Sequence, residues 1–515
     1  MNPVLCGLAA NPALPPALVD RMIATADPEV AAELADRPDL TRAQALALAA
    51  RDGDAAVRLA HTGHLTPADI DPVRQPLVAL ALLREGVAVP PEWARSLAGD
   101  SRVEIRESLA GCPDLPPDVT EVLAADPDWR VVAELALFAE PSTAGRLARH
   151  PHMAVRRAVA ANESAPPGAL AALVTGEDLP PASACRVCER EPTPFTHDPH
   201  CPNPDCTLLP GDACDGSHQS AVHDVLLAAV SNAATPAEAA AGCADHPSML
   251  VRWELALRRD LAAAVYARLA ADAISGVRAH TAGNPAIDVA VMRTLASDTG
   301  HNVQRSLAQN PRVPLDILVA LAESVRIGPT LLPRIAAASA AELARLASSR
   351  SPQVRRLVAE HRNLPPGVRD ALADDPDAKV VSAIAAHPGL GPDRLAGVVA
   401  RHGSRVLAGV ARNPDASPEL LDRLTAHEPP VRAVFRTVAR RPDATAAALE
   451  RCLADSKARE LAAEHPALPE QTITALLADP DPLVAAAAAR NPSLPRHAYL
   501  TAVIAAGSLI GGCRA

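Results

Sequence analysis

Five of the ten cysteines gather in one short stretch, and their spacing is suited to metal binding. The stretch reads CRVC at 185–188, HCPNPDC at 200–206 and GDACDGSH at 211–218. Two close cysteine pairs can offer four thiolates to one tetrahedral ion. The spacing therefore predicts a zinc site with the ligands Cys185, Cys188, Cys201 and Cys206. Four protein ligands leave no open position for water, so the zinc would be structural and not catalytic.

The start of the chain and its hydropathy favour a cytoplasmic protein. MNPVLCGLAANPALPP lacks the basic region and the unbroken apolar core of a secretory signal. Nowhere is there an apolar run of the roughly 18 residues that a membrane span needs. In a reducing cytosol a dense cysteine cluster favours metal binding over disulfides. The remaining cysteines are predicted to be small core residues: Cys6, Cys112, Cys243, Cys452 and Cys513.

A phrase of about 26 residues recurs through most of the chain. It opens with Val-Arg or a variant, reaches Asn-Pro or His-Pro after a short apolar stretch, and continues through Leu-Pro into a second apolar stretch. Val251, Val277 and Val303 are 26 residues apart, and Pro285 and Pro311 keep the same spacing. About seventeen units can be counted, some of them eroded.

Each unit is predicted to hold two short helices. Residues 406–413 have apolar side chains at helical spacing and end at Asn413-Pro414, because a residue before proline is disfavoured in the α region. A second helix is expected over 417–426, with Ser417 as N-cap and Pro418 in the first turn. Helices of two or three turns bury too little surface to be stable alone, so neighbouring units must stack into a solenoid.

The cysteine-rich stretch breaks the repeat pattern and sets the expected domain organisation. Helical repeats are predicted over 1–174 and 235–515, with a metal-binding insertion over 175–234. The insertion would divide the solenoid into two arms, and the metal would fix the insertion's loops or the angle between the arms. The predicted fold class is an all-α helical-repeat solenoid interrupted by this insertion.

The phrase VLAGVARNPDASPELLDRLTAHEPPVR, and LVAEHRNLPPGVRDALADDPDAKVV before it, resemble the leucine-rich repeat variant family. The resemblance implies a 3₁₀ helix and an α-helix per repeat, no β-strands and a right-handed superhelix. Paired helices of the HEAT type are the close alternative, but they use about 40 residues per unit.

The same family includes members with an iron–sulfur module, in which a two-residue cysteine pair precedes a further cysteine and Gly-Asp-x-Cys. Residues 211–214 match that last piece, which implies a 4Fe–4S cluster on Cys185, Cys188, Cys206 and Cys214. The module lies at the N-terminus in the family, and Cys201 would be left over here. A third alternative is similarity to the CDGSH type of 2Fe–2S domain, with His218 as a ligand, although Pro204 replaces a required cysteine.

A row of arginines recurs about once per repeat, each after Val or Ile. Such a row could bind phosphates or an acidic partner. The alternative is that each arginine pairs with an acidic residue of the preceding loop, such as Asp374 or Asp375, and fixes the geometry between repeats. The arginines are Arg58, Arg106, Arg156, Arg252, Arg278, Arg355 and Arg432.

Histidine and asparagine alternate at the end of the first helix of the unit. Their interchange predicts a local hydrogen bond at the turn, and neither catalysis nor metal ligation. The residues are His150, His246, His387, His465, Asn11, Asn162, Asn284, Asn310, Asn413 and Asn491.

Composition narrows the function further. The net charge is −11, there are only two lysines, and aromatic residues make up 2% of the chain, so nucleic-acid binding is not favoured. No Gly-x-Ser-x-Gly, HExxH or phosphate-binding glycine loop is present, so no enzyme activity is predicted. We expect a non-enzymatic scaffold that presents a concave surface to a protein partner.

Overall fold

The computed structural model describes residues 2–180, 219–499 and 501, and these residues contain helices and no β-strands. The predicted all-α repeat fold is confirmed. The predicted metal ligands Cys185, Cys188, Cys201, Cys206, Cys214 and His218 all lie outside the described residues. No described helix is long and apolar enough to cross a membrane.

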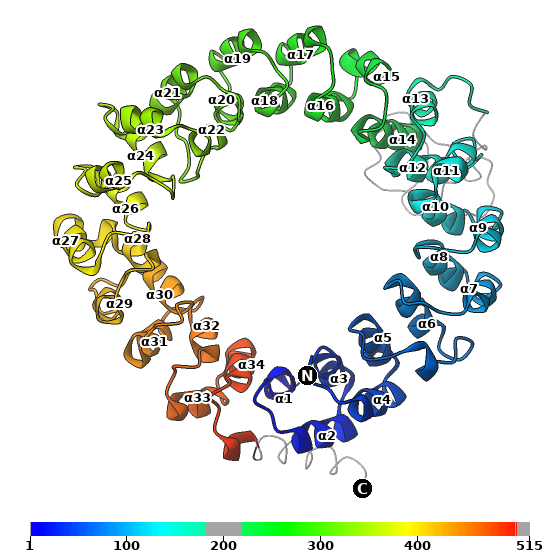
Figure 1. The fold of residues 1–515 in the computed structure, drawn as a ribbon, viewed down its shortest axis with the longest axis horizontal. Coiled ribbons are helices and arrows are strands. Elements are labelled where there is room, and N and C mark those ends of the chain that lie inside the picture. Colours follow the sequence, from blue (N-terminus) through cyan, green and yellow to red (C-terminus); the bar gives the residue numbers. More distant parts are fainter. Residues whose placement is uncertain (1, 181–218, 500, 502–515) are drawn as a thin grey trace. The chain divides into compact units, whose positions relative to one another are not determined.

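The chain forms two compact units, drawn in Figure 1. Unit 1 combines Met1–Asp69 with Ile327–Ala515, and unit 2 is Ile70–Arg326, so unit 1 takes residues from both predicted repeat regions. The helices of unit 1 before residue 70 are α1 (Pro3–Ala10), α2 (Pro16–Thr25), α3 (Pro28–Ala35), α4 (Arg42–Arg51), α5 (Gly53–His61) and the 3₁₀ helix η1 (Pro67–Asp69).

Unit 1 continues after residue 326 with short helix pairs. They are α22 (Pro333–Ala336), α23 (Ala340–Ala347), α24 (Pro352–Ala359), α25 (Pro366–Ala373), α26 (Ala378–Ile384), α27 (Pro392–His402), η3 (Gly403–Arg405), α28 (Leu407–Arg412), α29 (Pro418–Thr425), α30 (Arg432–Val438), α31 (Ala446–Cys452), α32 (Arg459–Glu464), α33 (Glu470–Leu476) and α34 (Pro482–Arg490).

Unit 2 has the same pattern. Its helices are α6 (Pro76–Arg84), α7 (Pro91–Ala98), α8 (Val103–Ala110), α9 (Pro117–Ala124), α10 (Trp129–Phe138), α11 (Pro141–Leu147), α12 (Met153–Ala161), α13 (Pro167–Thr175), α14 (Gln219–Ser231), α15 (Ala237–Ala241), η2 (Gly242–Asp245), α16 (Met249–Leu257), α17 (Ala263–Ala270), α18 (Ser275–Gly283), α19 (Val289–Ala296), α20 (His301–Ala308) and α21 (Leu315–Ser324).

The helix boundaries follow from local chemistry. In the unit predicted in most detail, α28 ends at Asn413 and α29 begins after Ser417, whose hydroxyl accepts a hydrogen bond from the Leu420 amide at 3.3 Å. Proline occupies the first turn of α29, where its missing N–H costs nothing. Both helices of most described pairs are α-helices, whereas the family resemblance implied one 3₁₀ helix per repeat.

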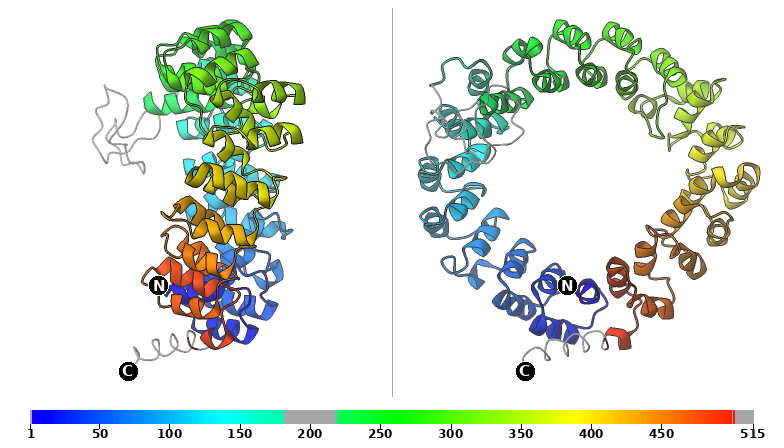
Figure 2. Two further views of the ribbon diagram at one scale, coloured as in Figure 1. Left: turned by 90° about the vertical axis from the view of Figure 1, so that its left-hand side faces the viewer. Right: turned by 180° about the vertical axis from the view of Figure 1, so that it is seen from behind.

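Each repeat contributes one helix to each of two layers. In unit 2 the first-layer helices α8, α10, α12, α14, α16, α18 and α20 follow one another along one side, and the odd-numbered helices cover the other side (Figures 1 and 2). The valines that mark the repeat lie in the first layer, and Val251, Val277 and Val303 are fully buried. The core is therefore a strip that runs from repeat to repeat between the two layers.

The stack of repeats is continuous between α12 and α14, on either side of residues 181–218. The Asn232 amide donates to the carbonyls of Ala160 and Asn162 at 2.9 and 2.8 Å. Equivalent bonds at Asn310 span 28 and 26 residues, whereas these span 72 and 70, so 70 − 26 = 44 residues are inserted into one repeat. The expectation that the insertion separates two arms is wrong, because α12 and α14 are in direct contact. Repeat packing also resumes before residue 234, the predicted end of the insertion.

Candidate interaction surfaces

The first helix of each repeat ends in a turn, and the first side chain of this turn makes hydrogen bonds both within the turn and to the preceding repeat. At Asn310, which is fully buried, Oδ1 accepts from the Arg312 amide at 2.9 Å, and this is the predicted local bond. The Nδ2 group donates to the carbonyls of Ala282 and Asn284 in the preceding repeat at 2.9 and 2.7 Å. Each such asparagine is therefore a clamp between repeats as well as a turn residue, and we call this residue the clamp.

Histidine keeps only part of the clamp geometry. The Nδ1 atoms of His150, His246 and His465 accept from the amide two residues on, at 3.0 to 3.1 Å, as the asparagine oxygen does. His387 is the exception, because its buried Nδ1 has no hydrogen-bond partner among the described residues. The amide two residues on, from Gly389, donates instead to Asp415 at 2.5 Å.

Arginine fills the clamp position in three further repeats, which the sequence analysis missed. Arg258 is 7% exposed and donates to the carbonyls of Val230, Asn232 and Thr235 at 2.6 to 3.0 Å, while Asp260 balances its charge at 2.6 Å. Arg37 with Asp39 and Arg441 with Asp443 are equivalent. The signal in the sequence is Arg-x-Asp at the position of asparagine.

Four of the seven arginines in the predicted row form two-pronged ion pairs. Arg278 binds Asp298 through Nε and Nη2 at 2.7 and 3.1 Å, and its Nη1 donates to the Asp272 carbonyl at 2.8 Å. The Arg278 hydrogen bonds hold the pKa of the Asp298 carboxyl below its usual range. Arg106–Asp126, Arg252–Asp272 and Arg355–Asp375 repeat this geometry.

The pairing has the opposite direction to the one expected. Asp375 is a partner, as suggested, but it follows Arg355 by 20 residues and lies after α25, in the loop that leads into α26, the first-layer helix of the next repeat. Each of these four guanidinium groups thus joins the loop before its own helix to the equivalent loop at the start of the next repeat. Their side chains are only 13–18% exposed, so they offer little charge to a ligand.

The other three arginines of the row differ. Arg58 is exposed and pairs with Asp36 at 2.9 Å. Arg156 is buried and donates to the carbonyls of His150 and Pro180 at 2.7 and 2.6 Å, and burial lowers its pKa. Arg432 is exposed and forms no ion pair with the described residues, because Arg436 takes the pairing role in that repeat and binds Asp455 at 3.1 Å. Arg459–Asp479 is a further pair that the sequence analysis did not include.

The scattered cysteines are packing residues where they are described. Cys112, Cys243 and Cys452 are buried and Cys6 is partly buried, while Cys513 lies outside the described residues. Burial, followed by the charge of Asp455, raises the pKa of the Cys452 thiol to about 12, so this thiol is unreactive at neutral pH.

Exposed apolar side chains are concentrated in unit 2. Among the described residues, unit 1 has three large exposed apolar side chains, Leu46, Leu331 and Leu483, and unit 2 has ten. Five of the ten lie on the first-layer helices α10, α14 and α16, which are joined through α12. These five are Phe138, Val222, Met249, Leu250 and Leu257, exposed by 62, 50, 41, 47 and 48%. We call them the apolar row.

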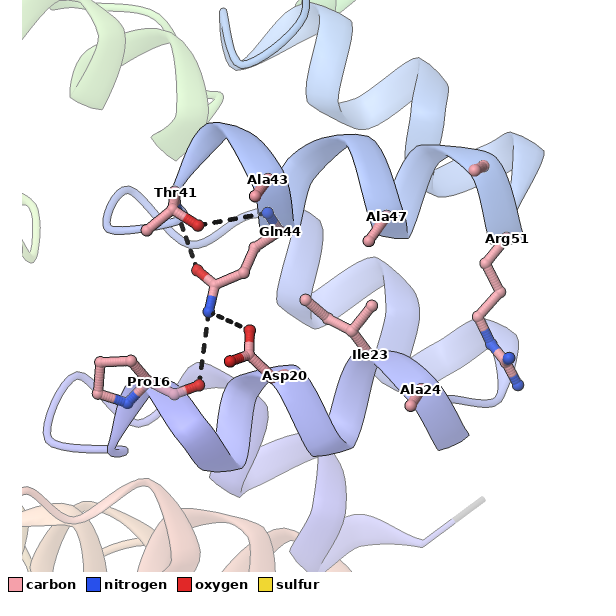
Figure 3. Close-up of a pocket in the computed structure, with 10 residues that line it drawn as sticks. Pro16, Asp20, Ile23, Ala24, Thr41, Ala43, Gln44, Ala47 and Arg51 are labelled. Carbon is pink, nitrogen blue, oxygen red and sulfur yellow. Dashed lines mark hydrogen bonds between the residues drawn. The ribbon is translucent and has the colours of Figure 1, made fainter.

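A groove of about 740 Å³ lies between α2 and α4 (Figure 3). At one end the Gln44 amide donates to Asp20 at 2.7 Å and to the Pro16 carbonyl at 3.4 Å, and its oxygen accepts from the Thr41 amide at 3.0 Å. The rest of the lining is mostly alanine, with Arg51 at the far end. Because the polar groups at the closed end already bond to one another, the groove resembles a helix–helix joint more than a ligand site.

Comparison with known proteins places one repeat in a family. Residues 352–377, which comprise α24, α25 and the loop after them, match the leucine rich repeat variant model. Residues 352–377 are thus a leucine-rich repeat variant repeat. The leucine-rich repeat variant resemblance is thus confirmed on the segment that includes the Arg355–Asp375 pair.

Solved structures also match the chain, with low superposition scores. One was solved in a study of the Pds5-Scc1 complex and cohesin function, with 13% identity and a TM-score of 0.23 over 92% of this chain and 83% of that one. Another is an engineered protein, with 14% identity and a TM-score of 0.13 over 95% of this chain and 93% of that one. No curated protein matches.

Proposed function

We propose that this protein is a non-enzymatic scaffold that binds a protein partner through the apolar row of unit 2. The observation that carries the proposal is that five exposed apolar side chains lie on α10, α14 and α16, which belong to one layer and stack through α12. Large apolar side chains that gather at the surface in one part of a folded protein are typical of protein interaction sites. Arginine and the large aromatic side chains commonly anchor such sites, and Phe138 is the most exposed member of the row.

The repeat framework supports this proposal by making the row rigid. Clamp residues and Arg–Asp pairs tie each first-layer helix to its neighbours, so a partner would bind without first ordering the surface. The nucleic-acid alternative is less well supported, since four arginines of the row are already paired with buried carboxylates.

The test is co-purification with the tagged full chain from its own cells, followed by mass spectrometry. We expect a protein recovered with the wild type to be depleted at least about tenfold by the double variant Phe138→Asp, Leu257→Asp. Leu483→Asp is the matched control, because Leu483 is equally exposed but lies in unit 1. Equal loss from the control, or retention by the double variant, would contradict the proposal.

We also propose that Cys185, Cys188, Cys201 and Cys206 bind one structural zinc ion. The support is the ligand spacing. In addition, hydrogen bonds hold the backbone of the described residues that directly precede this stretch. Arg149 and Arg156 donate to the carbonyls of Asp178 and Pro180, each at 2.6 Å, immediately before residue 181.

Elemental analysis of anaerobically purified protein tests the metal. We expect one zinc per chain, lost in Cys188→Ser, whereas brown protein that contains iron and absorbs near ~400 nm would establish the 4Fe–4S alternative on Cys185, Cys188, Cys206 and Cys214. Chelation should leave the helical circular dichroism signal intact, because α12 and α14 contact each other directly. Loss of most helical signal would contradict a local role.

A further inference from the structure

The first repeat of the chain packs on the last complete one. Helices α1 and α34 both belong to unit 1 and lie side by side in Figure 1. The Asn11 amide donates to the carbonyls of Ala489 and Asn491, each at 2.9 Å, although 478 and 480 residues separate them. Asn11 itself is fully buried in this contact.

This contact has the geometry of an internal joint between repeats. Asn491 donates in the same way to Ala463 and His465 at 2.8 and 2.9 Å, and Asn413 does so to Ala385 and His387 at 2.7 Å each. In each case the Oδ1 atom accepts from the amide two residues on. The repeat of α34 therefore stands in the same structural relation to Asn11 as a preceding repeat does to an internal asparagine clamp.

A glycine fits the backbone of α1 closely to α34. A Cβ added at Gly7 would collide with the Ala486 carbonyl and approach the Ala489 side chain within 2.8 Å. Gly409 in α28 is the internal counterpart, since a Cβ there would collide with the Ser382 carbonyl in α26. The terminal contact is thus as tight as a joint in the middle of unit 1.

Neither helix has a polar outer face that would suit it to meet water in place of another repeat. The α1 sequence PVLCGLAA has no charged residue, and its Leu8 and Ala9 are fully buried. The α34 sequence PLVAAAAAR has one, and its Ala487, Ala488 and Ala489 are fully buried. Separated, the pair would expose both apolar faces to water.

We infer that the α34 face is a docking site whose ligand is the repeat of α1 and α2 in the same chain, so that each of the two repeats covers the apolar face of the other. The occupant comes from the same chain because both partners fold within one unit, where their effective concentration exceeds that of a second copy. Arg37 holds the docked repeat from its other side by donating to the Ala9 and Asn11 carbonyls at 2.7 and 2.8 Å.

Hydrogen exchange of the full chain, measured by mass spectrometry, tests this inference. In the wild type we expect α1 and α34 amides to be as protected as those of α28, and equally so at all protein concentrations. Gly7→Val should raise exchange in α1 and α34 at least about tenfold. Gly409→Val should instead raise it in α26 and α28, and Gly397→Val should do neither, because a Cβ at Gly397 meets nothing within 4 Å.

Asn11→Asp is a second, milder variant that tests the same contact in case Gly7→Val does not fold. It keeps the acceptor for the Ala13 amide but removes both donors to α34, so exchange should rise in α1 and α34 and stay unchanged in α26 and α28. Rapid exchange of wild-type α1, or no response to Gly7→Val and Asn11→Asp, would overturn the inference. Protection that grows with protein concentration would also overturn it, since a second copy would then be the occupant.

Discussion

The clamp turns at Asn310 in unit 2 and at His387 in unit 1 occupy the same place in the repeat and differ in how their polar atoms are satisfied. Asn310 makes three hydrogen bonds, two of them to the preceding repeat. His387 is 5% exposed and its Nδ1 has no partner among the described residues. The repeat thus tolerates a weaker joint in unit 1, where the Asn413 Nδ2 group of the following repeat still donates to the His387 carbonyl.

The comparison teaches that the clamp is a position and not a residue type. Asparagine, arginine and histidine all reach it, but only asparagine and arginine carry enough donors to cover both carbonyls of the preceding repeat. We therefore expect the joints with arginine clamps to be the strongest and the joint at His387 to be the weakest.

The largest effect is expected from Arg258→Ala. The change leaves three buried carbonyls and Asp260 without their cation, which should lower the free energy of unfolding by about 3–4 kcal/mol. Urea denaturation of the full chain measures it. The neighbouring Arg259 is exposed, and Arg259→Ala should change the free energy by less than about 0.5 kcal/mol; similar losses from both variants would show that the clamp is not the cause.

A pH effect should single out His387. Burial, with a smaller contribution from nearby Arg362, His361 and Arg412, lowers the pKa of His387 to about 4. The unfolded chain binds this proton below about pH 6.5 and the folded chain does not, so stability is lost as the pH falls from about 6.5 to about 4, by at most about 3 kcal/mol.

His387→Asn should remove that pH dependence and stabilise the joint between α24 and α26 at low pH. Hydrogen exchange of those two helices at pH 7 and pH 5 measures the difference between variant and wild type. His497→Asn changes an exposed histidine and should leave the pH dependence intact. Identical pH profiles for wild type and His387→Asn would refute the assignment.

Asn310→Ala should weaken one joint of unit 2 by about 2 kcal/mol, since two buried carbonyls lose their donor. Exchange of α18 and α20 amides is the local readout. Asn302 lies exposed on α20, so Asn302→Ala serves as the matched control and should have little effect. No difference between the two variants would mean that Asn310 acts only on its own turn.

The smallest effect is expected from Arg278→Lys, at about 1 kcal/mol. Lysine keeps the charge but cannot bind Asp298 with two parallel donors. Arg293 pairs with Asp316 at 3.8 Å with both side chains about two-thirds exposed, so Arg293→Lys should be neutral in thermal denaturation. A neutral Arg278→Lys would show that the Arg–Asp row adds little to the joints.

Several features could be predicted from the sequence because they depend on neighbouring residues. Proline and the Ser417 cap define helix ends, and the periodic valines define the buried layer. The local half of the clamp was predictable for the same reason. The Arg–Asp pairs could also have been predicted, because each aspartate follows its arginine by 20 residues. The aspartates are Asp126, Asp272, Asp298 and Asp375. The sequence analysis instead expected the acidic partner in the loop that precedes the arginine.

What the sequence determined by itself is the repeat: its length, its two helices, its buried face and its turn. Only the tertiary structure decided which repeats meet. The stack passes from α12 to α14 across 44 inserted residues, and Asn11 clamps carbonyls 478 and 480 residues away. The physical reason is that the helix period and the caps are set by bonds within a few residues, whereas a stacking face fits any similar face. Chain connectivity and close packing at Gly7 select the partner.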